Sequence, residues 1–357
     1  MTKRERFMNF LQNRPVDRAP VAFFHHYCKH EDWYMGLERP QAFEDNIRYH
    51  KEARAIFDPD VIKIMNDTLM IMPVDISFVK KPSDLRNIHA PKTDSLYFQK
   101  ARELTKRVMA FYEDTDAPIY ATGFSTSLVM RSAFRRSTPA LDGEKYLLEF
   151  VKEDPDSVLK GMQNLVEGIA RFHEMLLKEC GADGIYLSIN NQASFFDDEF
   201  YRNEVAPYDK AVLNEANKLS DKNLLHICGY HGLSNNLSLF TDFEAAAYNI
   251  AVYAEGVSLS QGKKLFAGKP VFGGFSQDGV IYRGSKKEVT DAAWNILDEC
   301  GQTGVMLGAD CTTPTDIDDD RFNWVRDAAI AYAEGKAEAS REERKAALQK
   351  APQKMMI

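Results

Sequence analysis

One unit recurs along the whole chain: a short apolar run rich in β-branched residues, a polar or glycine-containing turn, and a longer stretch with helical periodicity. The runs that predict strands are Pro20–Tyr27, Asp60–Asn66, Pro118–Phe124, Asp183–Asn190, Asn223–Gly229, Ala247–Tyr253, Pro270–Phe275 and Val305–Cys311. Several are apolar on both faces, which is typical of parallel strands covered by helices. The helical stretches between them include Ser157–Glu179, Lys286–Cys300 and Asp318–Ala333, where apolar residues recur every three to four positions.

Strands that alternate with helices imply parallel crossovers, and eight such units close a (β/α)8 barrel of the TIM type. An open doubly wound sheet usually carries a glycine-rich phosphate turn. The sequence has neither GxGxxG after the first strand nor GxxxxGK[ST] anywhere. A TIM barrel needs roughly 250 residues and accepts insertions, so we expect residues 1–357 to form a single barrel domain.

The two ends of the chain do not fit simple βα units. Thr2–Asn13 predicts a helix, and residues 1–19 are expected to form a helical extension before the barrel. Residues 334–357 are expected to form a charged tail. Within it, Glu334–Lys354 is rich in Ala, Lys and Glu and predicts a solvated helix or a frayed end.

The charge balance narrows the classes of partner. The 53 acidic residues outnumber the 45 basic ones, so the net charge is −8, which disfavours binding to nucleic-acid phosphates and a polybasic membrane anchor. No apolar run reaches the ~18–20 residues of a membrane span, and no apolar signal core follows the basic first residues. We therefore predict a cytoplasmic protein that binds neither nucleic acid nor membrane. Five cysteines are too sparse for a disulfide framework.

The segment His226-Ile227-Cys228-Gly229 carries the sharpest chemical signal. Residues i and i+2 of a strand point to the same face, so the imidazole and the thiol project together near a strand end. Cys311 ends the last strand-like run, and in a barrel the carboxyl ends of the strands hold the active site. One His, two Cys and an open position form a catalytic zinc set. The alternative is a buried histidine with inert cysteines.

The remaining cysteines carry weaker signals. Cys180 and Cys300 each end an apolar helix before a glycine and are interpreted as packing residues. Cys28 follows the first strand near His25, His26 and His30, and these histidines could line the mouth of the barrel or lie solvated in a loop.

These motifs, in their order, resemble the uroporphyrinogen decarboxylase superfamily over nearly the whole chain. The HxC segment with the distant Cys311 is similar to the zinc pattern of its methylcobamide:thiol methyltransferase branch. Arg14-Pro15-Val16-Asp17-Arg18-Ala19-Pro20-Val21 looks like the superfamily's opening. Gly181-Ala182-Asp183-Gly184-Ile185 looks like a mid-barrel strand, and Val271-Phe272-Gly273-Gly274-Phe275 looks like its glycine-containing seventh strand.

The resemblance implies a zinc-dependent methyltransferase with Zn²⁺ on His226, Cys228 and Cys311, a small thiol as substrate, and a corrinoid as methyl donor. No DxHxxG segment for cobalamin occurs in the sequence, so the corrinoid would arrive free or on a partner protein. Relatives also suggest, by analogy, a homodimer and an acidic fourth ligand near the sixth strand, for which Glu255 is the candidate. The alternative for Glu255 is a solvated loop acid.

Asp67, in Met65-Asn66-Asp67, matches the catalytic Asp of the true decarboxylases. It is expected to orient substrate, or to cap a helix. Tyr186, Ser188 and Asn190, together with His25 and His26, are the candidates for the substrate pocket.

Two other functions stay open. A uroporphyrinogen decarboxylase-like carboxy-lyase would act on a tetrapyrrole or another carboxylate without metal. The arginines of that branch are missing from Phe23-Phe24-His25-His26-Tyr27-Cys28, and an octa-acid needs several cationic partners. The third possibility is a non-catalytic scaffold that binds metal or corrinoid.

Overall fold

The computed structural model describes residues 1–137 and 143–350, and its centre is a curled parallel sheet of seven strands that neighbour one another in sequence order. The strands are β1 (Ile62–Ile64), β2 (Ile119–Phe124), β3 (Gly184–Ile189), β4 (Leu224–Ile227), β5 (Ala247–Ile250), β6 (Val271–Phe275) and β7 (Val305–Ala309). Each lies within one of the predicted runs. Their residues are buried on both faces, as expected for a sheet that helices cover.

The run Pro20–Tyr27 is not a regular strand, which corrects the expectation of a closed (β/α)8 barrel: the described sheet is a curled, TIM-barrel-like sheet of seven strands. It forms isolated parallel bridges at Val21 and His25, and the Ala22 amide donates to the Leu307 carbonyl of β7. On its other side, the Val21 carbonyl accepts from the Asp60 amide. The segment therefore lies between β7 and β1. It stays irregular because a side chain, the Asp60 carboxylate, takes the Val21 N–H that a ladder would use.

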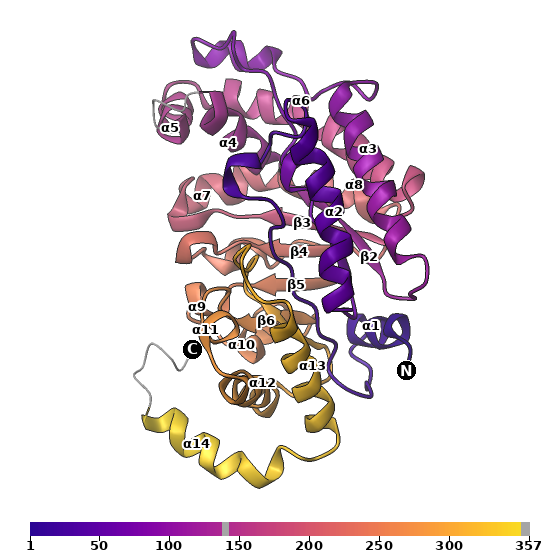
Figure 1. Cartoon of the computed structure of the whole chain (residues 1–357). Helices are drawn as coiled ribbons and strands as arrows, with labels where there is room; N and C mark the ends of the chain where they lie inside the picture. Colours follow the sequence, from indigo (N-terminus) through magenta and orange to yellow (C-terminus); the bar gives the residue numbers. More distant parts are fainter. Residues whose placement is uncertain (138–142, 351–357) are drawn as a thin grey trace.

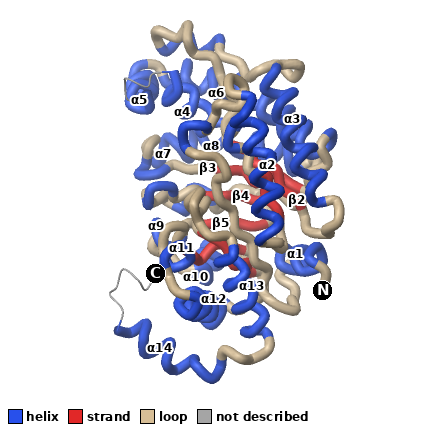
Figure 2. The backbone as a smooth tube through the Cα atoms, in the orientation of Figure 1, coloured by secondary structure: helices blue, strands red, loops and turns tan. Residues whose placement is uncertain are grey.

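Helices surround the sheet (Figure 2). They are α1 (Lys3–Leu11), α2 (Pro40–Ile56), α3 (Leu96–Met109), α4 (Thr126–Ser137), α5 (Gly143–Glu153), α6 (Pro155–Glu174), α7 (Asp198–Phe200), α8 (Ala206–Asn217), α9 (Val252–Glu255), α10 (Leu259–Leu265), α11 (Val280–Arg283), α12 (Lys286–Cys300), α13 (Asp320–Ala333) and α14 (Arg341–Lys350). The three predicted helical stretches correspond to α6, α12 and α13. The predicted N-terminal helix is α1, and the end of the tail, residues 351–357, lies outside the described residues.

Local sequence explains where several helices begin. At the start of α1, the Thr2 hydroxyl accepts a hydrogen bond from the Glu5 amide, and the Glu5 carboxylate accepts one from the Thr2 amide. Ser285 and Glu288 form the same capping box at α12. Such boxes satisfy two of the amides that a helix start leaves without intrahelical partners.

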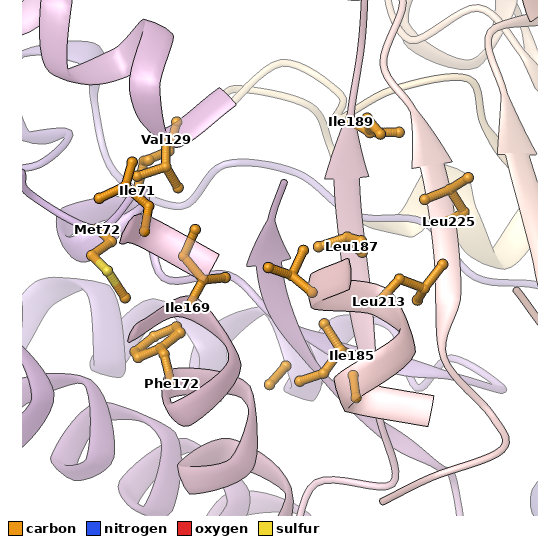
Figure 3. Close-up of a cluster of buried hydrophobic side chains, with 14 of the residues drawn as sticks. Ile71, Met72, Val129, Ile169, Phe172, Ile185, Leu187, Ile189, Leu213 and Leu225 are labelled. Atoms are coloured by element: carbon orange, nitrogen blue, oxygen red, sulfur yellow. The ribbon is translucent and has the colours of Figure 1, made fainter. Parts of the chain in front are cut away.

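The main core lies between the sheet and its helices. Outward-facing residues of β3, such as Leu187, pack with side chains of α6 and α8, such as Ile169 and Leu213 (Figure 3). These side chains are almost completely buried, and apolar burial of this kind is the main stabilising term of a fold.

A second cluster fills the inside of the curled sheet. Phe7 and Phe10 of α1 are fully buried there, against residues from the strands such as Tyr120, Leu224 and Met306. Helix α1 lies at the end of the strands opposite to α9 (Figure 1). The amino ends of the strands are therefore closed by apolar side chains, which leaves the carboxyl ends for polar ones. No helix in the described ranges combines the length and hydropathy that crossing a bilayer requires.

Candidate metal centre

The structure brings together His226, Cys228 and Cys311, although Cys311 is 83 residues from Cys228 in the sequence. The two sulfur atoms lie 3.7 Å apart. The Cys311 sulfur also lies 3.7 Å from Nε2 of His226. All three ligand atoms fall within 4.8 Å of one another. These are the only described residues whose His, Cys and acidic groups form such a cluster.

The distances between the ligand atoms fit one tetrahedral ion. With zinc–sulfur bonds of about 2.3 Å and zinc–nitrogen bonds of about 2.0–2.1 Å, the tetrahedral edges are ~3.8 Å between two sulfurs and ~3.6 Å between sulfur and nitrogen. The observed separations of 3.7 Å match both edges. Two soft thiol ligands and one imidazole also suit zinc better than magnesium or calcium. The third separation, between His226 Nε2 and the Cys228 sulfur, is at most 4.8 Å. The donor set and its spacing therefore fit zinc.

The imidazole of His226 is oriented by Asn249, its register partner on β5. Asn249 Oδ1 accepts hydrogen bonds from His226 Nδ1, at 2.5 Å, and from the Tyr186 hydroxyl, at 2.8 Å. The side-chain amide of Asn249 cannot flip without losing hydrogen bonds, because its Nδ2 donates to the carbonyls of Phe272 and Ala309. Nδ1 of His226 therefore carries the proton, and the lone pair of Nε2 faces the cysteines.

Cys228 follows the end of β4, where its amide donates to the Ile189 carbonyl. Its own carbonyl accepts from Nδ2 of Asn235. The carboxylate of Glu255 in turn accepts from both the backbone and the side-chain nitrogen of Asn235. Glu255 thus lies outside the three-residue cluster and holds the loop that supports Cys228. Burial raises the pKa of Glu255. Ligation by Glu255 stays a prediction.

Cys311 follows β7, and the residue before it anchors this turn. The Asp310 amide donates to the Phe275 carbonyl, and the Asp310 carboxylate accepts from the amides of Gly274 and Tyr253. Burial raises the pKa of Asp310 to about 7. Asp310 therefore ties the ends of β6, β5 and β7 together, as a supporting residue rather than a ligand.

The two cysteine thiols are coupled by a hydrogen bond. The hydrogen bond between them lowers the pKa of Cys228, with further help from the positive charges of Lys63 and Arg131. The same hydrogen bond and burial raise the pKa of Cys311.

Lys63 is a buried cation beneath this cluster. Its Nζ lies 4.4 Å from the ring centroid of Tyr186 and 5.5 Å from that of Phe24. The Tyr186 ring lies 5.3 Å from the imidazole of His226. In the described part of the chain, no acid forms an ion pair with Lys63. Burial lowers its pKa to about 8, while the nearby cysteines act in the opposite direction.

The other predicted pocket residues lie around this centre. Tyr186 is buried below it, and Ser188 is the register partner of His226 on β3. Asn190 Oδ1 accepts from Arg131, whose guanidinium also contacts Glu144.

The predicted histidines and Asp67 lie on one side of the same end of the sheet. Asp67 is 1% exposed and accepts a hydrogen bond from His26 Nδ1. His25 Nε2 faces Asp319 at 3.0 Å.

A cleft of about 710 Å³ opens at this end. It is lined by His26, by Gly229 and Thr312, which adjoin the two cysteines, and by aromatic residues that include Trp33 and Tyr253. A volume of this size accommodates a small-molecule substrate.

Sequence reasoning did not single out Lys63, Asn249, Asn235 or Arg131. Lys63 and Asn249 carried a usable signal, because a polar side chain inside an otherwise apolar strand must find a polar environment in the core. Asn235 and Arg131 carried none, because their partners are distant in sequence.

Comparisons with known proteins bear on the family and the fold of the chain. The model of the uroporphyrinogen decarboxylase (URO-D) family matches residues 2–332. A methyltransferase from Methanosarcina mazei has a TM-score of 0.71 and 15% identity, covering 93% of this chain and 99% of its own. A B12-independent methionine synthase from Shewanella sp. W3-18-1, in complex with selenomethionine, has a TM-score of 0.55 and 14% identity, covering 90% and 99%. No curated protein matches the chain. At these identities the two structures establish a shared fold.

Proposed function

The chain belongs to the uroporphyrinogen decarboxylase family, and from that premise we propose that it is a zinc-dependent methyltransferase. In this proposal, a methyl group passes from a corrinoid (methylcobamide) or similar donor to a small thiol. The observation that carries the proposal is the convergence of His226 Nε2 with the sulfurs of Cys228 and Cys311 within 4.8 Å of one another, with two of the three separations at 3.7 Å. The description of one structural neighbour as a methyltransferase agrees with it.

Zinc, when bound, supplies the Lewis acidity that lowers the pKa of a coordinated thiol from its free value near ~8.5. The chain's residues prepare the site for that chemistry. Asn249 fixes the His226 tautomer. A neutral imidazole and two thiolates offset the two positive charges of the ion, so the Lys63 ammonium remains as excess positive charge. That excess favours a substrate that binds as an anion, which a thiolate is and a neutral alcohol is not.

The methyl donor enters from outside the chain. The cleft at the carboxyl ends of the strands is the route by which donor and thiol reach the centre. We propose a corrinoid that is either free or held on a partner protein, and a homodimer remains part of the same proposal.

The proposal is tested by methyl transfer from methylcobalamin to a panel of small thiols, with protein handled under metal-replete, chelator-free conditions. Wild type should bind zinc and methylate at least one thiol. Cys228→Ser and Cys311→Ser should lose both properties. Cys180→Ser is the matched control, because Cys180 lies outside the cluster and packs against Met175.

Two outcomes contradict the proposal and point to its alternatives. Porphyrinogen decarboxylation that survives both cysteine substitutions identifies a carboxy-lyase that needs no metal. Full zinc occupancy without methyl transfer to any thiol identifies a binding scaffold.

A further inference from the structure

A histidine–aspartate pair lies beside the cleft and is not used by the metal cluster. His26 Nδ1 and Asp67 Oδ1 are 2.7 Å apart. The other Asp67 oxygen accepts from the amides of Tyr27, at 2.6 Å, and Cys28, at 3.0 Å. These three bonds hold a buried carboxylate in its charged form, and they lower the pKa of Asp67 against the effect of burial.

The Asp67 carboxylate determines which nitrogen of His26 is a base. A charged carboxylate only accepts hydrogen bonds, so His26 Nδ1 must carry the proton that it donates. Nε2 then keeps its lone pair. Among the described residues, none forms a hydrogen bond with this Nε2.

His26 lines the same cleft as the residues next to the two cysteines. His26 lines the cleft together with Gly229 and Thr312, the neighbours of Cys228 and Cys311. Its ring packs on Trp33, with centroids 4.1 Å apart, and its side chain is 14% exposed. The imidazole is therefore held on two sides and open toward the cleft.

We propose that His26 is the general base that takes the proton of the thiol substrate, and that Asp67 positions it. The inference rests on the proposed function. In the step, the S–H bond of the thiol breaks and a new N–H bond forms at Nε2. The thiolate sulfur then forms the S–CH3 bond as the methyl group leaves its donor, whose electron pair stays on the donor. The imidazolium afterwards returns the proton to water through the cleft.

The competing interpretation is a structural pair that only fastens Asn66–Leu69 to the first segment. The two interpretations differ in where the thiol proton goes. If His26 takes it, the proton remains on the protein when a thiol binds. If His26 is structural, the proton enters the buffer, whether or not His26 is present.

The experiment measures thiol binding to the zinc-loaded protein by calorimetry at neutral pH, with 2-mercaptoethanol, in two buffers of different ionisation enthalpy. Wild type should retain the proton, whereas His26→Gln and Asp67→Asn should release it. His30→Gln is the matched control, because His30 lines the same cleft and packs on the same Trp33 but has no carboxylate partner in the described ranges. Zinc content should be equal in all four proteins.

Equal proton release by wild type and His26→Gln overturns the base role while leaving the methyltransferase intact. Zinc-loaded wild type that binds no thiol contradicts the proposed function, and the base role falls with it. A second measurement needs no variant and no thiol: nitrogen NMR of the histidines should find His26 with its proton on Nδ1. A proton on Nε2 overturns the proposal.

The rate of methyl transfer to two thiols of different acidity gives a further test of the base role. His26→Gln should lose about 10²-fold in rate with 2-mercaptoethanol, the low end for loss of a general base. It should lose much less with the more acidic thiophenol. An equal loss with both thiols contradicts proton transfer by His26.

Discussion

At the amino ends of the strands, α1 closes the curled sheet with Phe7 and Phe10, and Arg6 bridges the carboxylates of Asp17 and Asp60 behind them. At the carboxyl ends, the interior holds an imidazole, two thiols and the ammonium of Lys63. The first arrangement gains stability by removing apolar area from water. The second places polar groups where burial is unfavourable unless a ligand or ion completes them.

The comparison teaches that stability and chemistry are separated along the strands. Substitutions at the α1 end should change the free energy of unfolding and leave metal binding unchanged. Substitutions at the other end should do the reverse. The predictions below test that separation, beginning with the largest effect.

Replacing both cysteines, as Cys228→Ser with Cys311→Ser, should abolish metal binding. Two of three ligands then lose the soft sulfur, and metal content should fall from about one ion per chain to under about a tenth. Elemental analysis checks it. With chelator present, the free energy of unfolding of this variant should equal that of wild type. A large loss of stability in the metal-free variant would contradict the separation of stability from chemistry.

Phe10→Ala should destabilise the chain by about 3–5 kcal/mol, the usual cost of removing a buried phenyl ring. Denaturant unfolding measures this, with Leu96→Ala as the control, because Leu96 is exposed and its truncation should stay within about 0.5 kcal/mol. Zinc stoichiometry of the folded Phe10→Ala protein should stay unchanged. A matching loss of zinc would show that the two ends are coupled.

Asn249→Ala should weaken zinc binding by about 10- to 100-fold, because His226 Nδ1 loses the acceptor that orients the ring. Competition with a chromophoric chelator gives the affinity. Unchanged affinity would mean that packing alone orients His226.

The pH dependence of stability should reflect buried histidines. The His50 imidazole donates through Nδ1 to the Asn46 carbonyl and accepts the Met65 amide at Nε2, and burial lowers its pKa from 6.5 to about 4. The unfolded chain binds this proton below pH ~6.5, so the free energy of unfolding should fall as pH drops from there toward 4.

The slope should reach at most about 1.4 kcal/mol per pH unit for each such histidine. The pKa of His173 is also lowered to about 4 by burial, so His50→Gln should remove only part of the slope. If the free energy of unfolding has the same pH slope in wild type and His50→Gln, protonation of His50 does not oppose folding, and the prediction is wrong.

The sequence predicted seven strands well, because buried parallel strands leave continuous apolar runs such as Val305–Leu307. The run Pro20–Tyr27 looked equivalent, but the side chain of Asp60 competes for its backbone, and no local pattern reveals such a contact. The spacing of His226 and Cys228 predicted a shared strand face, and Cys311 was found from its position at a strand end. The support by Asn249, Asn235 and Lys63 depends on neighbours that only the packing of the curled sheet brings together.

Zinc-edge X-ray absorption of the purified, metal-replete wild type tests the central claim most directly. A site on His226, Cys228 and Cys311 predicts two protein sulfur scatterers at about 2.3 Å and an imidazole nitrogen at about 2.0–2.1 Å. A spectrum with only oxygen and nitrogen neighbours, or a protein that retains no zinc, would contradict it.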